Sequence, residues 1–325
     1  MPCSDHVNAL AARHPTIAAV SAPVISASGL RKAYGDFEAV RGVDIEIHEG
    51  EVYAFLGPNG AGKTTTAEIL EGYRPATAGE VRVLGVDPAH PTREWRERIG
   101  IVLQQCRMAP ELTVSETLEL FAGYYRTPRG VDETISHVGL ARKADARAGS
   151  LSGGQLRRLD VGVALIGDPD VLFLDEPTTG FDPSARRQAW DVIANLKSLG
   201  KTVFLTTHYM DEAQRLADRV AIISAGRIVA EGRPDELGDR ELRPATIRFR
   251  LPAGTALGDL PPGVEPSESP DGELELTTPT PVEVLNRLTG WALERGVDLA
   301  GLEVHRPSLE DIYLELTNEA PEDDR

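Results

Sequence analysis

A glycine-rich loop, Gly57-Pro58-Asn59-Gly60-Ala61-Gly62-Lys63-Thr64, lies between a short apolar run and a stretch of helix-forming residues. Lys63 would bridge the β- and γ-phosphates of a nucleotide, the Thr64 hydroxyl would bind Mg²⁺, and Thr65 would lie beside them. Glycines let successive backbone N–H groups turn toward phosphate oxygens, and the following helix adds its positive end. A glycine-rich turn with a chance lysine is the alternative, which the strand–loop–helix context disfavours. The loop therefore predicts an α/β fold of the phosphate-loop NTPase type.

A second apolar run ends in two carboxylates. Val171–Leu174 is followed directly by Asp175 and Glu176, which is typical of a buried strand that delivers charge to one edge of a sheet. As in other phosphate-loop ATPases, we expect Asp175 to act at Mg²⁺ and Glu176 to face the water that attacks the γ-phosphate. A strand that simply ends in two solvated acids is the alternative, and the nearby phosphate loop disfavours it.

A third motif is the pentapeptide Leu151-Ser152-Gly153-Gly154-Gln155, which opens a helical run to Gly167. A serine at a helix start with two glycines beside it makes a second phosphate-binding helix terminus. One chain then has two phosphate-binding helix N-termini, one after the phosphate loop and one at this pentapeptide, which is too many for one γ-phosphate at one site. A plain helix cap in a glycine-rich loop is the alternative. With this pentapeptide the sequence resembles the ATP-binding cassette (ABC) family, whose signature it is, over about residues 24–233.

The resemblance implies roles for further residues. Tyr34 matches the aromatic residue that stacks on adenine, and Gln104 matches the glutamine that touches Mg²⁺ and the attacking water. Asp182 matches the loop that crosses between subunits, although Phe181 stands where the family more often has leucine. His208 matches the switch histidine at the γ-phosphate. Taken singly, such residues are more often structural. The implied catalytic residues are Glu176, His208 and Gln104; the implied Mg²⁺ ligands are Thr64, Gln104 and Asp175; Ser152, Gly153, Gly154 and Gln155 would contact ATP.

The resemblance also implies partners. In the family two cassettes face each other head to tail, and each ATP lies between one subunit's phosphate loop and the other subunit's signature helix. We therefore expect a homodimer that closes on two ATP and reopens after hydrolysis, acting on a separate integral membrane permease. The segment of about residues 105–150 matches the subdomain that contacts the permease, with Glu111–Glu119 near that contact.

Between these motifs, short β-rich runs alternate with helical stretches. This alternation is typical of a mixed or parallel sheet that is flanked by helices. Ser115–Gly149 breaks the alternation with apolar residues at helical spacing, and we interpret it as a helical insertion. The predicted strands are Val43–Ile47, Val52–Leu56, Val81–Leu84, Ile99–Leu103, Val171–Leu174, Thr202–Leu205 and Val220–Ile223.

A composition shift near residue 240 predicts a second, small α/β domain over residues 241–319, after a nucleotide-binding domain over residues 24–240. From Glu241 onward the chain has a net charge of −11, out of −17 in total. We expect residues 1–23 and the acidic tail 320–325 to be disordered. The predicted elements are strands Thr246–Leu251, Glu273–Thr277 and Val297–Val304, helices Val282–Arg295 and Ser308–Thr317, the latter capped by Ser308, and a short helix with a linker over Pro234–Pro244.

The end of this second domain indicates to which subfamily of ABC proteins the chain is similar. Pro307–Thr317 looks like the terminal motif of daunorubicin-resistance-type (ABC-2) export ATPases, and Leu84–Pro88 resembles the same subfamily. The resemblance implies a small multi-helix permease and export of drugs, lipids or other hydrophobic compounds. In the simpler interpretation the segment only forms the apolar face of a docking helix, and both interpretations can hold. That face consists of Leu309, Ile312, Tyr313 and Leu316.

Composition excludes other classes. The net charge of −17 argues against a nucleic-acid partner. Two cysteines, Cys3 and Cys106, cannot form a disulfide framework, and no run approaches the ~18–20 apolar residues of a membrane span. We expect a cytoplasmic protein that is peripheral on the inner face of the cell membrane. The alternative function is a soluble ABC ATPase in assembly, although the two cassettes of translation types and the zinc sites of repair types are missing.

Overall fold

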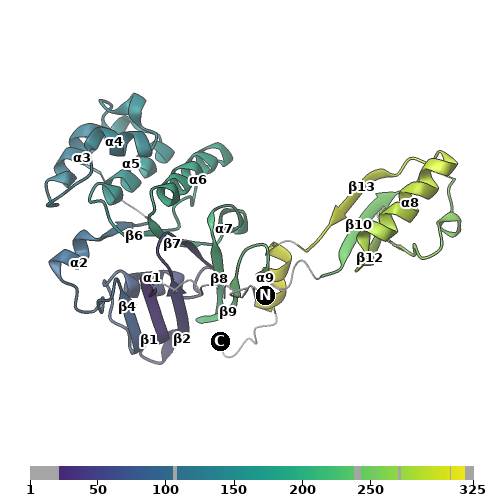
Figure 1. The fold of residues 1–325 in the computed structure, drawn as a ribbon, viewed down its shortest axis with the longest axis horizontal. Coiled ribbons are helices and arrows are strands. Elements are labelled where there is room, and N and C mark those ends of the chain that lie inside the picture. The colour runs from purple at the N-terminus through teal and green to yellow at the C-terminus, as the bar shows by residue number, and fades with distance from the viewer. Residues whose placement is uncertain are drawn as a thin grey trace, which may run out of the picture.

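The computed structural model describes residues 22–104, 108–237, 243–252, 254–269, 272–307 and 309–318. Figure 1 shows a larger body, built from β1–β9 and α1–α7, and a smaller body, built from β10–β13 and α8. The helix α9 (Leu309–Asn318) follows the smaller body in the chain but lies beside the larger one, where it contacts α7 (Met210–Leu216). The chain therefore leaves the larger body and comes back to it.

A six-stranded sheet forms the middle of the larger body, in the order β5-β6-β7-β3-β8-β9. All neighbouring strands are parallel except β8 and β9. Every residue of β3, β6 and β7 is buried, as expected for parallel strands that are covered on both faces. The strands are β3 Val52–Leu56, β5 Ile99–Val102, β6 Val171–Asp175, β7 Thr202–Thr207, β8 Arg219–Ser224 and β9 Arg227–Gly232.

A smaller antiparallel sheet, in the order β2-β1-β4, covers one face of the central sheet. The helix α1 (Lys63–Leu70) lies between the two sheets and contacts β2, β4, β6 and β7. Three phenylalanine rings fill this core, with centroids 5.6 Å (Phe55–Phe204) and 5.9 Å (Phe173–Phe204) apart. The strands are β1 Ile25–Tyr34, β2 Phe37–Ile47 and β4 Ala78–Val83, and α2 Arg93–Glu97 leads from β4 to β5.

A layer of helices covers the other face of the central sheet. Because side chains alternate along a strand, Val171 and Phe173 of β6 belong to the core between the sheets, while Leu172 and Leu174 belong to the core beneath the helices. The predicted helical insertion is confirmed as α3 and α4. The helices are α3 Val114–Ala122, α4 Val131–His137, α5 Gly153–Leu165, α6 Pro183–Ser198 and α7 Met210–Leu216.

The smaller body is a four-stranded antiparallel sheet, in the order β11-β12-β10-β13, with α8 on one face. Ile247 and Phe249 of β10 pack against Leu288 and Trp291 of α8. The opposite face is polar; there the Arg248 guanidinium lies 3.4 Å from the Glu275 carboxylate. The elements are β10 Ala245–Arg250, β11 Ser267–Glu268, β12 Leu274–Thr278, α8 Pro281–Arg295 and β13 Ala300–His305.

The sequence-based expectations differ from the structure at several boundaries. The strand expected at Val297 begins at Ala300, because Val297 and Leu299 pack on the core of the smaller body first. Residues 234–236 form a turn and Leu237 begins a 3-10 helix, with the Leu237 N–H donating to the Arg233 oxygen at 2.9 Å; most of the rest of the short helix and linker expected over Pro234–Pro244 lies outside the described part. Residues 1–21, 105–107, 238–242 and 319–325 lie outside the described part, as does Ser308, the expected cap. In the described part no helix combines the length and apolar character needed to cross a bilayer.

Candidate active site

The glycine-rich loop runs from the end of β3 to the start of α1, and two of its glycines have no room for a side chain. A Cβ atom at Gly57 would lie 2.4 Å from the backbone oxygen of Ile223. Gly62 has a φ of +105°, and a Cβ atom there would lie 2.6 Å from the backbone oxygen of Ala39. Because β2 and β8 hold the loop this closely, its backbone has a fixed conformation at the N-terminus of α1.

Lys63 lies almost buried at the first position of α1, with 4% of its surface exposed. Its ammonium group donates hydrogen bonds to the backbone oxygens of Gly57 (2.8 Å) and Pro58 (3.1 Å), which fold the side chain back along the loop. The same ammonium lies 3.3 Å from a carboxylate oxygen of Glu176. A buried cation needs such partners, and this position places its charge beside the loop.

Glu176 is the point at which the expected catalytic residues meet. Its carboxylate lies 3.4 Å from His208 Nδ1 and accepts a hydrogen bond of 3.4 Å from Gln104 Nε2. Burial raises the pKa of Glu176, but the charges of Lys63 and His208 outweigh that effect and hold the pKa below its usual range. The residue has a φ of +43°, a strained conformation for a glutamate and one that often occurs at functional sites. The group is therefore a charged carboxylate held in a fixed orientation.

The three expected Mg²⁺ ligands line one cavity of about 270 Å³. They offer a hydroxyl (Thr64), an amide oxygen (Gln104) and a carboxylate (Asp175), which suits the preference of Mg²⁺ for oxygen ligands. Asp175 accepts a hydrogen bond from the Thr206 hydroxyl. Burial raises the pKa of Asp175, and this hydrogen bond opposes the rise. With one carboxylate, the set is not a cluster of three acidic, histidine or cysteine side chains, and no such cluster occurs among the described residues.

A larger cavity of about 610 Å³ opens above the loop, a size common for small-molecule sites. Tyr34 lies at its edge, with the Lys32 ammonium 5.3 Å and the Arg74 guanidinium 5.4 Å from the ring centroid. Phe37 also lines this cavity and was not predicted from the sequence. The signal was present, since Gly35 and Asp36 form a two-residue hairpin turn that pairs Tyr34 with Phe37. The expected site residues in the lining are Tyr34, Asn59, Gly60, Gly62, Lys63, Thr64, Thr65, Gln104, Glu176 and His208.

The signature residues do not line that cavity. Ser152 caps α5, where its hydroxyl accepts the Gln155 N–H at 3.3 Å and its own N–H donates to the Gln155 side chain at 3.0 Å. Asp182 caps α6 in the same way, accepting from the N–H groups of Ser184 (2.8 Å) and Ala185 (2.9 Å). Within one chain, the structure therefore separates the signature and Asp182 from the loop.

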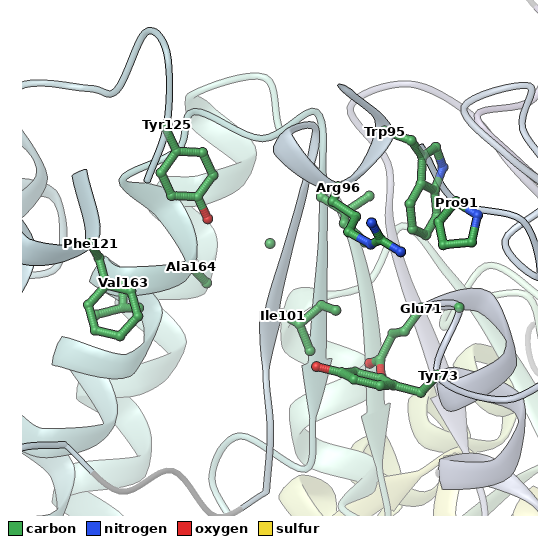
Figure 2. A pocket seen from close by; sticks show the side chains of 13 residues that line it. Glu71, Tyr73, Pro91, Trp95, Arg96, Ile101, Phe121, Tyr125, Val163 and Ala164 are labelled. Atoms are coloured by element: carbon green, nitrogen blue, oxygen red, sulfur yellow. The ribbon is translucent and has the colours of Figure 1, made fainter. Parts of the chain in front are cut away.

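A groove of about 440 Å³ lies between a helical side, formed by residues of α3 and α5 and by Tyr125, and a core side, formed by α2, β5 and the residues after α1 (Figure 2). Figure 2 shows Phe121 and Tyr125 on the helical side, and Tyr73 and Trp95 on the core side. Glu71 is buried on the core side and also borders the cavity that contains Asp175. Burial and the nearby carboxylates of Asp175 and Glu68 raise the pKa of Glu71 to about 8. The groove thus has aromatic walls and a carboxyl group that is largely neutral at pH 7.

Known proteins resemble this chain in sequence. Residues 40–179 match a family described as ABC transporter, and residues 245–308 match the ABC transporter domain-containing protein-like, C-terminal domain. Nod factor export ATP-binding protein I of Ralstonia nicotianae is 39% identical over 308 residues, covering 91% of this chain and 94% of the relative. Daunorubicin resistance ATP-binding protein DrrA3 of Streptomyces coeruleorubidus is 36% identical over 305 residues, covering 91% and 96%.

Solved structures resemble it in fold. The dimeric post-hydrolysis state of the ATP-binding cassette MJ0796, bound to ADP and Pi, is 27% identical with a TM-score of 0.57, covering 64% of this chain and 98% of that one. The structure of cbiO1 from Clostridium perfringens, part of the ABC transporter complex cbiONQ, is 28% identical with a TM-score of 0.60, covering 66% and 90%. The matched share corresponds in size to the larger body.

Proposed function

This chain belongs to the ATP-binding proteins of ABC transporters and has their ATPase fold, and we propose that it is the ATP-hydrolysing subunit of an exporter of a drug, a lipid or another hydrophobic compound. The observation that carries the proposal is the cavity shared by the phosphate loop, Glu176, Gln104 and His208. The relatives named for Nod factor export and daunorubicin resistance support export.

In the proposed reaction, the phosphate loop and Lys63 hold the β- and γ-phosphates, and Tyr34 stacks on the adenine. Glu176, kept charged, accepts a proton from the attacking water, and His208 contacts the γ-phosphate beside it. Thr64, Gln104 and Asp175 would hold Mg²⁺, which neutralises charge on the phosphate oxygens when bound. Since Lys63 pairs with Glu176 in this structure, ATP would draw the ammonium toward its phosphates.

The exposed signature supports a head-to-tail dimer. Ser152 and Gly153 are exposed at the N-terminus of α5, and Asp182 is exposed at that of α6. A 13-residue helix with two glycines at its start offers N–H groups to a phosphate, and among the described residues the cavity above the phosphate loop does not reach this terminus. A second copy would bring its loop to this terminus, as the dimeric cassette among the solved structures suggests.

The substitution Glu176→Gln tests this proposal. The variant should bind ATP, lose hydrolysis because the amide cannot take a proton, and accumulate as an ATP-bound dimer, measured by light scattering after size exclusion. Glu49→Gln is the matched control, because Glu49 is exposed on the turn before β3, and it should behave as wild type. A Glu176→Gln protein that stays monomeric with saturating ATP would contradict the dimer.

We also propose that the groove in Figure 2 receives a cytoplasmic segment of a separate permease, which would place the subunit on the inner face of the cell membrane. Its walls are aromatic, and Tyr73 is 64% exposed at its edge. Exposed aromatic side chains around a groove are common at protein interfaces.

Tagged protein purified from detergent-solubilised host membranes tests this docking. A stoichiometric multi-helix membrane protein should follow it, and Tyr73→Ala should release that protein while the ATPase activity of the isolated subunit is kept. Val282→Ala is the control, because Val282 is exposed on the smaller body. If only soluble proteins follow an active ATPase, a role in assembly replaces the transport proposal.

A further inference from the structure

Two buried ionisable side chains, Arg157 and Glu212, hold the segment that leads from Glu176 to Asp182. The Nε atom of Arg157 donates a hydrogen bond of 3.1 Å to the backbone oxygen of Pro177. The next residue, Thr178, donates its hydroxyl to Glu212 Oε1 at 2.8 Å. Arg157 is 7% exposed and Glu212 is fully buried. Burying an ionisable side chain is costly unless it forms hydrogen bonds, and here hydrogen bonds of both side chains reach two neighbouring residues, Pro177 and Thr178.

Arg157 joins the signature helix to the strands of the candidate active site. It lies on α5, five residues after Ser152, and its Nη2 donates to the backbone oxygen of Asp175 at 2.9 Å. Its Nη1 donates to the backbone oxygen of Leu103, the residue before Gln104. One rigid guanidinium therefore holds two chain segments: the one that presents Gln104, and the one that presents Glu176 and begins the 177–182 connection.

Glu212 makes the corresponding link from the other helix. It lies on α7, four residues after His208, and its Oε1 also accepts the indole N–H of Trp190 in α6 at 3.1 Å. Burial raises the pKa of Glu212, and hydrogen bonds from Thr207, Thr178 and Trp190 oppose the rise. The carboxyl group thus connects the segment of His208, the residue Thr178 and the helix that Asp182 caps.

We propose that Arg157 and Glu212 are positioning residues that fix residues 177–178 and so keep the signature helix, the hydrolytic glutamate and the switch histidine in register. The inference rests on the proposed function, since only in a head-to-tail dimer do the N-terminus of α5 and Glu176 of one chain act on different nucleotides. There the N-terminus of α5 contacts the nucleotide of the partner, while Glu176 acts on the nucleotide of its own loop. A displacement of α5 would reach Leu103, Asp175 and Pro177 through the guanidinium.

Steady-state kinetics test the role. Neither side chain lines the nucleotide cavity, so Arg157→Met should lower kcat about 10–100-fold, the cost of a small misplacement of reacting groups, with KM and the Kd for a fluorescent ADP analogue within about twofold. Thr178→Val removes only the hydroxyl that Glu212 accepts and should lower kcat in the same way. Arg98→Met is the control, because Arg98 pairs with Asp170 at the opposite end of β5 and β6; its kcat should equal that of wild type.

A double-mutant cycle separates a shared role from two independent structural ones. Because both groups hold neighbouring residues, Arg157→Met combined with Thr178→Val should lower kcat much less than the product of the single effects. Glu212→Gln keeps an acceptor for Thr178 and should retain more activity than Glu212→Met. Unfolding midpoints near that of wild type show that the variants are folded.

The outcomes are distinguishable. Hydrolysis and ATP-dependent dimers of the wild-type protein are measured first, and their absence would contradict the proposed function itself. With an active wild type, unchanged kcat in Arg157→Met and Thr178→Val would overturn only the positioning role. Multiplicative losses in the double variant would overturn the shared segment, and an equal loss of kcat and of ADP binding would show a general effect on folding.

Discussion

The substitution Gly153→Ala should separate folding from the action of the signature helix. Gly153 is exposed at the first position of α5, and a Cβ atom there would meet nothing within 4 Å in the same chain. Replacing a helical glycine by alanine stabilises a helix by up to about 1 kcal/mol. In a domain of this size that corresponds to an increase in Tm of roughly 2–4 °C at most. The isolated subunit should thus be as stable as wild type or slightly more stable.

Hydrolysis should nevertheless fall. In the proposed dimer the N–H groups at this terminus approach a phosphate of the partner's nucleotide, and an added methyl group would stand between them. We expect kcat/KM to fall about tenfold or more, by analogy with other small displacements in active sites. ATP-dependent dimers should be lost over the same range of protein concentration.

The assay pairs a coupled ATPase measurement with thermal unfolding and light scattering. Gly290→Ala is the matched control, because Gly290 lies in α8 of the smaller body with nothing within 4 Å of its added Cβ atom. It should gain similar stability and lose no activity. If Gly153→Ala hydrolyses ATP and dimerises as wild type does, the N-terminus of α5 does not contact the partner's nucleotide. Turnover recovered on mixing Gly153→Ala with Lys63→Ala would show that one chain's signature serves the other chain's loop.

Three further predictions concern pH, the last helix and the metal. The pKa of Glu71 in the folded protein, about 8, lies above its usual 4.5. Protonated Glu71 therefore contributes fully to the stability of the fold below pH 4.5, and this contribution is lost as the pH rises through 8. Between pH 6 and 8.5, the free energy of unfolding of Glu71→Gln, measured in urea, should fall by about 2 kcal/mol less than that of wild type. Ile312 of α9 is fully buried, so Ile312→Ala should weaken the docking of α9 by roughly 2–4 kcal/mol, seen as faster hydrogen exchange in α9 with little change in the larger body. Chelation of Mg²⁺ should abolish hydrolysis but leave binding of a fluorescent ATP analogue detectable, as should Asp175→Asn; hydrolysis that persists in the chelator would contradict the metal site.

The sequence predicts those parts of the fold in which the pattern is local. The strand Val52–Leu56 and the loop after it follow from an uninterrupted apolar run and a fixed glycine spacing, and β3 has the predicted bounds. The strand β1 was missed because its alternation breaks at Gly29, which has a φ of +58° at a change of register. The strand β9 was missed because it is a partly buried edge strand.

Some residues of the candidate site could be predicted from the sequence and others could not. Tyr34, Gln104 and His208 were predicted from resemblance to a family, since nothing local distinguishes a single residue of these types. Arg157 and Glu212 were not predicted, because charged residues on helices usually face water. The hydrogen bonds that link them to residues 103, 175, 177 and 178 span 18 to 54 residues of the chain, and those of Arg157 reach backbone oxygens, which leave no periodic signal.

The return of α9 to the larger body has a consequence for the order of synthesis. The helix α7 and the core on which Tyr313 packs are made before the smaller body, and α9 follows only after it. During translation the larger body can therefore fold around its nucleotide while this apolar surface is still open to water. Until α9 emerges, a chaperone or the α9 of a neighbouring nascent chain could cover the surface, so a swapped α9 between two chains is a product to look for after rapid expression.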